Sequence, residues 1–328
     1  IHGEKALSAI GKMEDGEIIM LNNVRMDEQE VELEGDFDTQ SESMLVQHLA
    51  GIADAYVNDA FACAHRGSAS IVGFTHLLPC IAGELMRHEL DKLGTALENP
   101  VRPCIAVLGG VKVDDSVIVA DNMLRKEICD HIWVTGGVAN LFLHLSGIKL
   151  GDVNIQFLQN ELKDNWKETV AIASKLLKDF PGRIIMPSDV AANVEGNRVD
   201  LSIRQLPIEA PLFDLGLTSI RALSKAIKTA GTIILNGPAG VFELPDFALG
   251  TVEMISACAE TSGYVVVGGG HTATLISQRG LVKSMGHVST GGGASLELLA
   301  GRTLPGLASL EASAKQFEMS IQKPLEHL

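Results

Sequence analysis

Short runs of apolar, often β-branched residues alternate with amphipathic stretches through the second half of the chain. The apolar runs predict strands, and the stretches between them have the residue spacing of helices. Strands that alternate with helices in this way are typical of βαβ units around a parallel sheet. The predicted strands are Cys104–Leu108, His131–Thr135, Arg183–Met186, Thr232–Asn236 and Tyr264–Val267.

The first hundred residues carry a weaker form of the same pattern. Strands are predicted at Glu17–Leu21 and Asp54–Asn58, with a helix near Gln40–Gly51 between them. A longer helix is predicted over Ala82–Asn99 and must end before Pro100. This helix either connects two lobes or is an ordinary core helix, and its apolar spacing fits both alternatives.

Length and composition indicate a globular protein of two domains. The chain has 328 residues, of which 46% are apolar, and a single core rarely organises more than about 250–300 residues. No stretch approaches the roughly 18 consecutive apolar residues needed to cross a membrane, and no signal peptide is recognisable. The formal net charge of −15 argues against nucleic acid or an anionic membrane as a partner, because both need basic stripes. We therefore expect a cytoplasmic protein, in which an anionic substrate needs a local cluster of positive residues.

The five cysteines are widely separated and have no paired spacing of the kind that metal sites use. We expect them to be reduced and buried. They are Cys63, Cys80, Cys104, Cys129 and Cys258.

Glycine-rich breaks recur where the predicted strands end. Glycine lets the backbone come close to a ligand and leaves the free N–H groups of the next helix facing it. Those N–H groups and the helix dipole favour anions, phosphate above all. Several such corners along one sheet predict a polyphosphate laid across the carboxyl ends of the strands. The breaks are Leu108–Lys112, Thr135–Gly137, Asn236–Gly240, Gly268–Thr272 and Ser289–Gly293.

The common nucleotide-binding signatures are missing from the sequence. It has no G-x-x-x-x-G-K-[ST] loop, no G-x-G-x-x-G motif that opens a helix, and no protein-kinase H-R-D or D-F-G element. A P-loop enzyme and a Rossmann dehydrogenase therefore lose most of their support. The dehydrogenase alternative would require nicotinamide binding, which a titration with NADH tests.

The glycine-rich turns and their neighbours resemble those of the phosphoglycerate kinases. The resemblance runs in family order from residue 17 to about residue 310 and so covers nearly the whole chain. It implies reversible transfer of the γ-phosphoryl group of ATP to the carboxylate of 3-phosphoglycerate, which gives 1,3-bisphosphoglycerate and ADP. The motifs that carry it are Leu21–Arg25, Val57–Arg66, Leu108–Ser116, Asn236–Glu243 and His287–Glu297.

The resemblance also implies an α/β architecture of two doubly wound parallel-sheet lobes joined by a long helix and a hinge. Residues 1–84 would belong to the N-terminal phosphoglycerate-binding lobe, with the tail 305–328 packing back on it. Residues 85–99 would form the connecting helix, and residues 100–304 the C-terminal nucleotide-binding lobe. Closure about the hinge suits the chemistry, because water must be kept from the acyl phosphate. We expect a monomer.

For the acceptor, the resemblance implies two arginines as phosphoglycerate ligands. Arg25 and Arg66 match the family's positions, and a planar guanidinium offers paired donors to a phosphate or a carboxylate. His65 lies beside Arg66 and is either a further substrate contact or a structural residue.

For the transfer step, the resemblance implies that Lys112 stabilises charge on the transferring phosphoryl group. Gly291, Gly292 and Gly293 would open a helix whose free N–H groups meet the same group. The substrate carboxylate is itself the attacking group, so no covalent nucleophile or general base is required. We therefore expect catalysis by positioning and charge neutralisation, with Lys112, Gly292 and Gly293 as the catalytic residues.

For the nucleotide, the resemblance implies contacts along the glycine-rich edge. Gly136 and Gly137 would let the adenine lie against the backbone, and Glu243 would accept a hydrogen bond from a ribose hydroxyl. Asn236, Gly237 and Pro238 would border the triphosphate. The remaining predicted nucleotide-binding residues are Gly109, Gly110, Lys112, Gly269, Gly270, His271 and Thr272.

The sequence departs from the family pattern at the metal and nucleotide contacts. His271 stands where the family usually has an aspartate that ligates magnesium, and Mg²⁺ prefers oxygen ligands. The ion is then held mainly by phosphates and water, with a carboxylate such as Asp115 as a candidate, and its ligand set stays open. Ser116 stands where many members have a second lysine. The runs Val113–Ser116 and Gly268–Thr272 together resemble the archaeal branch of the family.

The chain begins at Ile1, at a point well inside the family's N-terminal lobe. The opening Arg-x-Asp-x-Asn and His-x-Gly-Arg elements, which supply much of the family's basic patch, do not appear. We expect either a further segment that precedes Ile1 or a fragment. The alternative to the kinase is therefore a nucleotide-binding module that does not turn over.

Overall fold

The computed structural model describes residues 1–33 and 35–319. Its contacts divide the described residues into two compact units, residues 1–91 with residues 302–319, and residues 92–301. The boundary falls within α6 (Glu84–Glu98), whose apolar face buries Met86 and Leu90. Residues 320–328 of the predicted tail lie outside the described residues. Across the described ranges, no helix combines the length and the apolar character that a membrane span needs.

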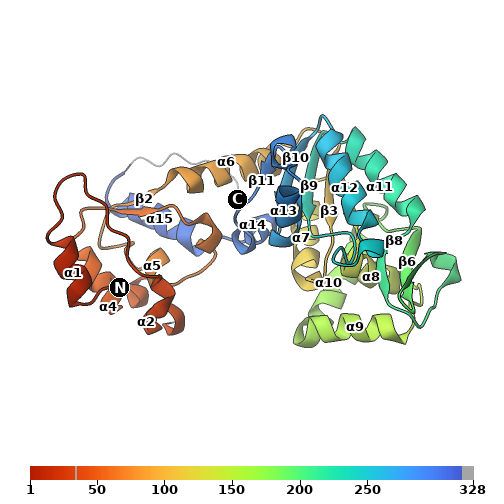
Figure 1. Cartoon of the computed structure of the whole chain (residues 1–328), viewed down its shortest axis with the longest axis horizontal. Coiled ribbons are helices and arrows are strands. Elements are labelled where there is room, and N and C mark those ends of the chain that lie inside the picture. Colours follow the sequence, from red (N-terminus) through yellow and green to blue (C-terminus); the bar gives the residue numbers. More distant parts are fainter. Residues whose placement is uncertain (34, 320–328) are drawn as a thin grey trace. The chain divides into compact units, whose positions relative to one another are not determined.

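The larger unit is built on a six-stranded sheet in which every neighbouring pair is parallel (Figure 1). The spatial order is β11-β10-β9-β3-β4-β5. The chain thus winds outward from β3 to β5, returns to pair β9 with β3, and winds outward again. The strands are β3 (Cys104–Leu108), β4 (His131–Val134), β5 (Ile184–Ile185), β9 (Thr232–Asn236), β10 (Tyr264–Gly268) and β11 (His287–Val288). The five strands predicted for this half are confirmed, although β5 is shorter than expected.

Helices cover both faces of this sheet (Figure 1). Val107 of β3 and Leu235 of β9 pack with Leu223 and Met254 on the face that α11 and α12 cover. Side chains alternate along a strand, so Leu108 faces the opposite layer, which contains α7, α8 and α10. The helices are α7 (Val113–Arg125), α8 (Gly136–Leu145), α9 (Asp152–Leu162), α10 (Trp166–Asp179), α11 (Leu217–Thr229), α12 (Leu249–Glu260), α13 (Gly270–Gln278) and α14 (Gly293–Leu299). The mixed α/β fold class with parallel sheets is confirmed.

A small antiparallel sheet, which the sequence analysis did not predict, lies between α10 and α11 in the chain. Its order is β7-β6-β8, with β6 (Asp189–Val194), β7 (Asn197–Ser202) and β8 (Leu212–Leu215). Glu195 and Gly196 join β6 to β7, and both have positive φ angles, as a tight two-residue hairpin turn requires. Strand β6 of this sheet contacts α11, and strand β8 contacts α12.

The smaller unit contains a two-stranded parallel sheet, β1 (Tyr56–Asn58) and β2 (Cys80–Ala82). Its core joins Val46, Phe74 and Leu310, so the C-terminal helix packs into the same core as the N-terminal residues. The Ser313 hydroxyl ties this helix to β2, because it accepts a hydrogen bond from the Cys80 amide at 3.0 Å. The helices are α1 (Glu4–Ile10), α2 (Glu28–Glu32), α3 (Phe37–Ser41), α4 (Met44–Ala50), α5 (Ala69–Val72) and α15 (Pro305–Gln316).

The strand predicted at Glu17–Leu21 is wrong. These residues have no regular secondary structure and pair with no strand in the described part of the chain. Ile18 is 95% and Met20 is 94% exposed, so two of the apolar side chains that suggested a strand bury almost no surface here. A strand is stabilised by its neighbours rather than by its own sequence, and this segment has none among the described residues.

All five cysteines are free, four of them are buried, and Cys63 is half-buried. Burial raises the pKa of the Cys104, Cys129 and Cys258 thiols to about 12. These thiols are therefore protonated and unreactive at neutral pH.

Candidate functional site

The helices α7, α8, α13 and α14 follow the strands β3, β4, β10 and β11, so they begin at the carboxyl edge of the sheet. The residues immediately before α7, α8 and α13 are Lys112, Thr135 and Gly269. The loop that follows β9 lies at the same edge, since all of these strands are parallel. The strand order reverses between β3 and β9, and in doubly wound sheets ligands bind at such a switch point.

The turns after β3 and β9 are bonded directly to each other. The Gly109 amide donates to the Asn236 carbonyl at 2.9 Å, and the Gly110 amide donates to the Pro238 carbonyl at 2.9 Å. A Cβ atom on Gly109 would lie 2.3 Å from the Pro238 oxygen, and one on Gly237 would lie 2.2 Å from the Gly109 oxygen. Only glycine allows this approach, so the switch point is a pair of interlocked turns.

Gly136 and Gly137 complete this packing. Gly136 has φ of +54°, and a Cβ atom there would lie 3.0 Å from the Gly110 nitrogen. The Gly137 amide donates to the Gly110 carbonyl at 3.0 Å. The turn after β3 thus occupies the space beside both α-carbons, and this packing explains why glycine is needed at both positions. Their contact with adenine stays a prediction.

The start of α13 is open in contrast. A Cβ atom on Gly270 would have nothing within 4 Å. Thr272, in the same first turn, is 1% exposed, and its hydroxyl has no hydrogen-bond partner among residues 1–33 and 35–319. A buried hydroxyl without a partner costs free energy, and this one lies among the first N–H groups of a helix. The first turn of α13 therefore has the donors and the room that a phosphate needs.

The last glycine run is shaped by two buried serines. The Ser289 hydroxyl accepts a hydrogen bond from the Gly291 amide at 3.0 Å and lies 2.5 Å from the Ser295 hydroxyl. Gly292 has φ of +43°, with open space where a Cβ atom would be. Gly293 begins α14, so the expected helix start is confirmed.

Lys112 and Glu243 are both exposed at this edge. Glu243 follows Phe242, whose ring centroid lies 6.4 Å from that of His271. The loop after β9 therefore runs beside the start of α13, and it brings the predicted ribose and phosphate contacts into one neighbourhood.

The ligands of a magnesium ion at this edge are not fixed by the described residues. His271 supplies nitrogen rather than the oxygen that Mg²⁺ prefers. Within the described ranges, no group of three or more His, Cys, Asp or Glu side chains could hold a metal ion. One carboxylate together with nucleotide phosphates and waters is enough to hold Mg²⁺, so Asp115 stays a predicted ligand.

The smaller unit brings Arg25 and Arg66 together. Both arginines line one cavity of about 360 Å³, although they lie far apart in the sequence. The other lining residues are Glu30, Val31, Leu33, Gly35, Gly67 and Ser68. Two guanidinium groups on one cavity suit a phosphate or carboxylate. His65 is half-buried and does not line this cavity.

Glu30 is a site residue that the sequence analysis missed. It is 8% exposed and accepts hydrogen bonds from the Ser68 hydroxyl at 2.8 Å, and from the Ser70 amide and hydroxyl, both at 2.7 Å. Glu30 belongs to α2 and the serines follow Arg66, so the carboxylate fixes the arginine turn against α2. A single glutamate in a short helix carries no sequence signal for this role.

A larger cavity of about 400 Å³ in the same unit has a different chemistry. Its lining is largely apolar, with Ile10, Leu45 and Phe74 among its residues and no arginine or lysine among the described residues that line it. Size alone does not make it a phosphate site, so the two arginines stay the predicted anion site.

Comparison with known proteins decides the family. The family model for phosphoglycerate kinase matches residues 1–302. The chain belongs to the phosphoglycerate kinase family.

Relatives and solved structures agree with this assignment. The chain is 44% identical over 313 residues to the phosphoglycerate kinase of Methanothermobacter thermautotrophicus, which covers 95% of this chain and 75% of that protein. Phosphoglycerate kinase 2 of Methanosarcina acetivorans is 42% identical over 319 residues, 97% of this chain and 76% of its own length. The resemblance to the archaeal branch is therefore confirmed.

The fold comparison points the same way. The crystal structure of phosphoglycerate kinase from Pyrococcus horikoshii matches with a TM-score of 0.87 and 36% identity, over 97% of this chain and 78% of that chain. The structure of phosphoglycerate kinase from Coxiella burnetii matches with a TM-score of 0.70 and 31% identity, over 90% and 72%.

Proposed function

We propose that this protein transfers the γ-phosphoryl group of ATP to the carboxylate of 3-phosphoglycerate, reversibly, to give 1,3-bisphosphoglycerate and ADP. The observation that carries the proposal is the family match over residues 1–302. The paired arginines of one unit and the glycine-rich edge of the other supply the chemistry that such a reaction needs.

The acceptor binds at the arginine cavity. Arg25 and Arg66 donate paired hydrogen bonds to the anionic groups of 3-phosphoglycerate, and Glu30 holds the turn that carries Arg66. His65 stays a candidate contact through its place beside Arg66.

The nucleotide binds along the carboxyl edge of the large sheet. Adenine lies near Gly136 and Gly137, and the triphosphate passes Gly109, Gly110 and the turn Asn236–Pro238. Glu243, exposed on the following loop, accepts from the ribose. The residues Gly269, Gly270, His271 and Thr272 bind phosphate at the start of α13. The open space at Gly270 and the buried Thr272 hydroxyl, unpartnered among the described residues, support this part.

Transfer requires charge neutralisation rather than a protein nucleophile. Lys112 and the amides of Gly292 and Gly293 stabilise the phosphoryl group as it moves to the substrate carboxylate. Mg²⁺ would be held mainly by the nucleotide phosphates and water, with Asp115 as the candidate carboxylate, and it would offset the phosphate charge.

The assay is ADP formation by the purified protein with Mg-ATP, in the presence and absence of 3-phosphoglycerate. We expect turnover only with 3-phosphoglycerate. Lys112→Ala should lower kcat by about a hundredfold or more, and its stability should be unchanged because Lys112 is exposed. Nucleotide binding without turnover in the unmodified protein would instead support a non-catalytic nucleotide-binding module. Failure to bind either substrate would contradict both functions.

We also propose that the protein works in the cytoplasm as a monomer. The five free cysteines, four of them buried, agree with a reducing compartment. Light scattering that gives a dimer mass would contradict the monomer.

A further inference from the structure

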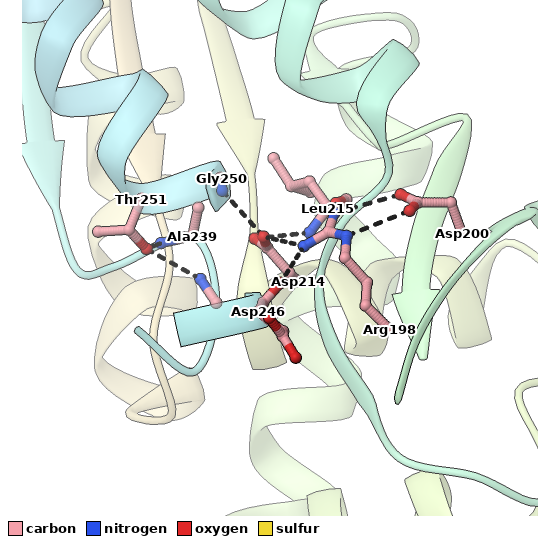
Figure 2. Close-up of polar contacts among 9 residues, drawn as sticks. Arg198, Asp200, Asp214, Leu215, Ala239, Asp246, Gly250 and Thr251 are labelled. Carbon is pink, nitrogen blue, oxygen red and sulfur yellow. Dashed lines mark hydrogen bonds and ion pairs between the residues drawn. The ribbon is translucent and has the colours of Figure 1, made fainter. Parts of the chain in front are cut away.

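Arg198 of β7 uses all of its side-chain donors within the larger unit (Figure 2). Nε and Nη2 donate to the carboxylate of Asp200, at 3.1 and 3.2 Å. Nη1 donates to the carboxylate of Asp214 at 2.8 Å and to the Asp246 carbonyl at 3.0 Å, and Nη2 donates to the Leu215 carbonyl at 2.7 Å. Each of the five N–H groups thus has an acceptor, and only a guanidinium offers five donors.

Asp214 connects Arg198 to the start of α12 through hydrogen bonds. Its side chain is 0% exposed, and the oxygen that accepts from Arg198 also accepts from the Gly250 amide at 2.8 Å. The second oxygen accepts from the Leu215 amide at 2.9 Å. A buried carboxylate bonded to three donors fixes each of them strongly, because the bonds are charge-assisted.

Thr251, the next residue of α12, holds the loop after β9 (Figure 2). Its hydroxyl oxygen accepts from the Ala239 amide at 3.0 Å and from the Gly240 amide at 3.3 Å. The loop also passes directly against the carboxylate, since a Cβ atom on Gly240 would lie 2.6 Å from an oxygen of Asp214. The first turn of α12 is therefore the support on which this loop rests.

The contacts continue from this loop to the glycine-rich edge. The Pro238 carbonyl, one residue before Ala239, accepts from the Gly110 amide at 2.9 Å. Gly110 lies two residues before Lys112, and Glu243 lies at the far end of the same loop. A shift of α12 would move residues assigned to both the phosphates and the ribose.

We propose that Arg198 and Asp214 are positioning residues for the nucleotide, which they serve by fixing the loop 236–243 through the first turn of α12. The inference rests on the proposed function, because it needs a nucleotide at this edge. Neither residue needs to contact the nucleotide, and the acceptor cavity belongs to the other unit.

The test compares Asp214→Asn with Asp200→Asn. Asparagine keeps the shape of Asp214, but its NH₂ group must face an N–H donor of Arg198, Gly250 or Leu215. Asp200 also pairs with Arg198, but within residues 1–33 and 35–319 its carboxylate bonds neither α12 nor the loop. We expect Asp214→Asn to weaken Mg-ADP binding and raise the KM for ATP by about tenfold, with the KM for 3-phosphoglycerate unchanged. Asp200→Asn should change the dissociation constant of Mg-ADP and the KM for ATP by less than about twofold.

Hydrogen exchange directly measures how well the backbone amides of the loop and of α12 are protected. The amides of Ala239, Gly240 and Gly250 should lose protection in Asp214→Asn and keep it in Asp200→Asn. Should Asp214→Asn fail to fold, the pair Thr251→Val and Thr251→Ser replaces it, since only serine keeps the acceptor for Ala239 and Gly240. Unchanged nucleotide affinity in folded Asp214→Asn or Thr251→Val overturns the inference. Absence of nucleotide binding by the unmodified protein overturns the proposed function instead.

Discussion

Replacing Glu30 by glutamine tests whether the arginine cavity depends on the hydrogen bonds that hold the turn after Arg66. The buried carboxylate accepts three hydrogen bonds, from the hydroxyl of Ser68 and from the amide and hydroxyl of Ser70. Glutamine has nearly the same shape, but it loses the charge and places an NH₂ group where an acceptor stood.

The magnitude follows from these three bonds. A hydrogen bond to a charged group contributes about 1.5–3 kcal/mol, and a neutral one about 0.5–1.5 kcal/mol. The serine hydroxyls can rotate to accept from the new NH₂ group, whereas the Ser70 amide can only donate. We therefore expect Glu30→Gln to lower the free energy of unfolding by about 1–2 kcal/mol.

The functional effect should be confined to the acceptor. Loosening the turn that carries Arg66 should raise the KM for 3-phosphoglycerate by about five- to tenfold, while the KM for ATP stays within error. Urea unfolding measures the stability, and steady-state kinetics with each substrate varied in turn measures the two constants. Glu28→Gln is the matched control, because Glu28 lies on the same helix and is exposed.

Two results would refute this reasoning. A normal KM for 3-phosphoglycerate in Glu30→Gln would show that the carboxylate stabilises the turn without positioning Arg66. An equal change in Glu28→Gln would show that the effect comes from the charge of α2 rather than from the bonds to Ser68 and Ser70.

Three further predictions concern the larger unit. Thr272→Val should leave stability unchanged or slightly higher, because the hydroxyl has no partner in the described part of the chain, yet it should weaken ADP binding by about tenfold; calorimetry that finds normal ADP affinity would contradict the phosphate role. Gly136→Ala should lower the free energy of unfolding by about 1–3 kcal/mol, through its positive φ and its contact with the β3 turn, whereas Gly270→Ala should keep stability and weaken nucleotide binding; urea unfolding and ADP titration of both variants separate the two kinds of glycine. Burial acts to raise the pKa of Asp189, but hydrogen bonds from the Ser219 hydroxyl and from the Thr218 and Ser219 amides outweigh it and hold the pKa below its ordinary value. The carboxylate therefore stabilises the fold fully above about pH 4, and this contribution is lost as the pH falls through the lowered pKa. The stability difference between the unmodified protein and Asp189→Asn, measured by urea unfolding, should be constant from neutral to mildly acidic pH and shrink below about pH 4; a difference that grows on acidification would contradict it.

The central strands of the large sheet were predictable because they are buried on both faces. Cys104–Leu108 and Thr232–Asn236 read as continuous apolar runs between turn residues, and the structure gives the same bounds. Small or polar residues fill much of β6 and β7, so no such run marks them, and only Glu195–Gly196 signals the hairpin. Glu17–Leu21 was wrongly predicted as a strand for the opposite reason. Its apolar residues have the pattern of a strand, but the segment pairs with no strand in the described chain.

The candidate site was predictable to a similar extent. The glycine turns were visible because a cluster of glycines directly after an apolar strand indicates a close backbone approach, but their interlocking at Gly109, Gly136 and Gly237 depends on which strands are neighbours. Glu30 and Asp214 act through hydrogen bonds to residues distant in sequence. A single carboxylate has no pattern from which such a partner can be inferred, so only the tertiary structure identifies it.

The interlocked turns also determine when a nucleotide site can exist during synthesis. The partners of the Gly109 and Gly110 amides are Asn236 and Pro238, which follow only after residues 111–235 have been synthesised. Until then the two amides lack these acceptors. Under the proposed function, a nucleotide that binds across both turns therefore requires β9 to have joined β3.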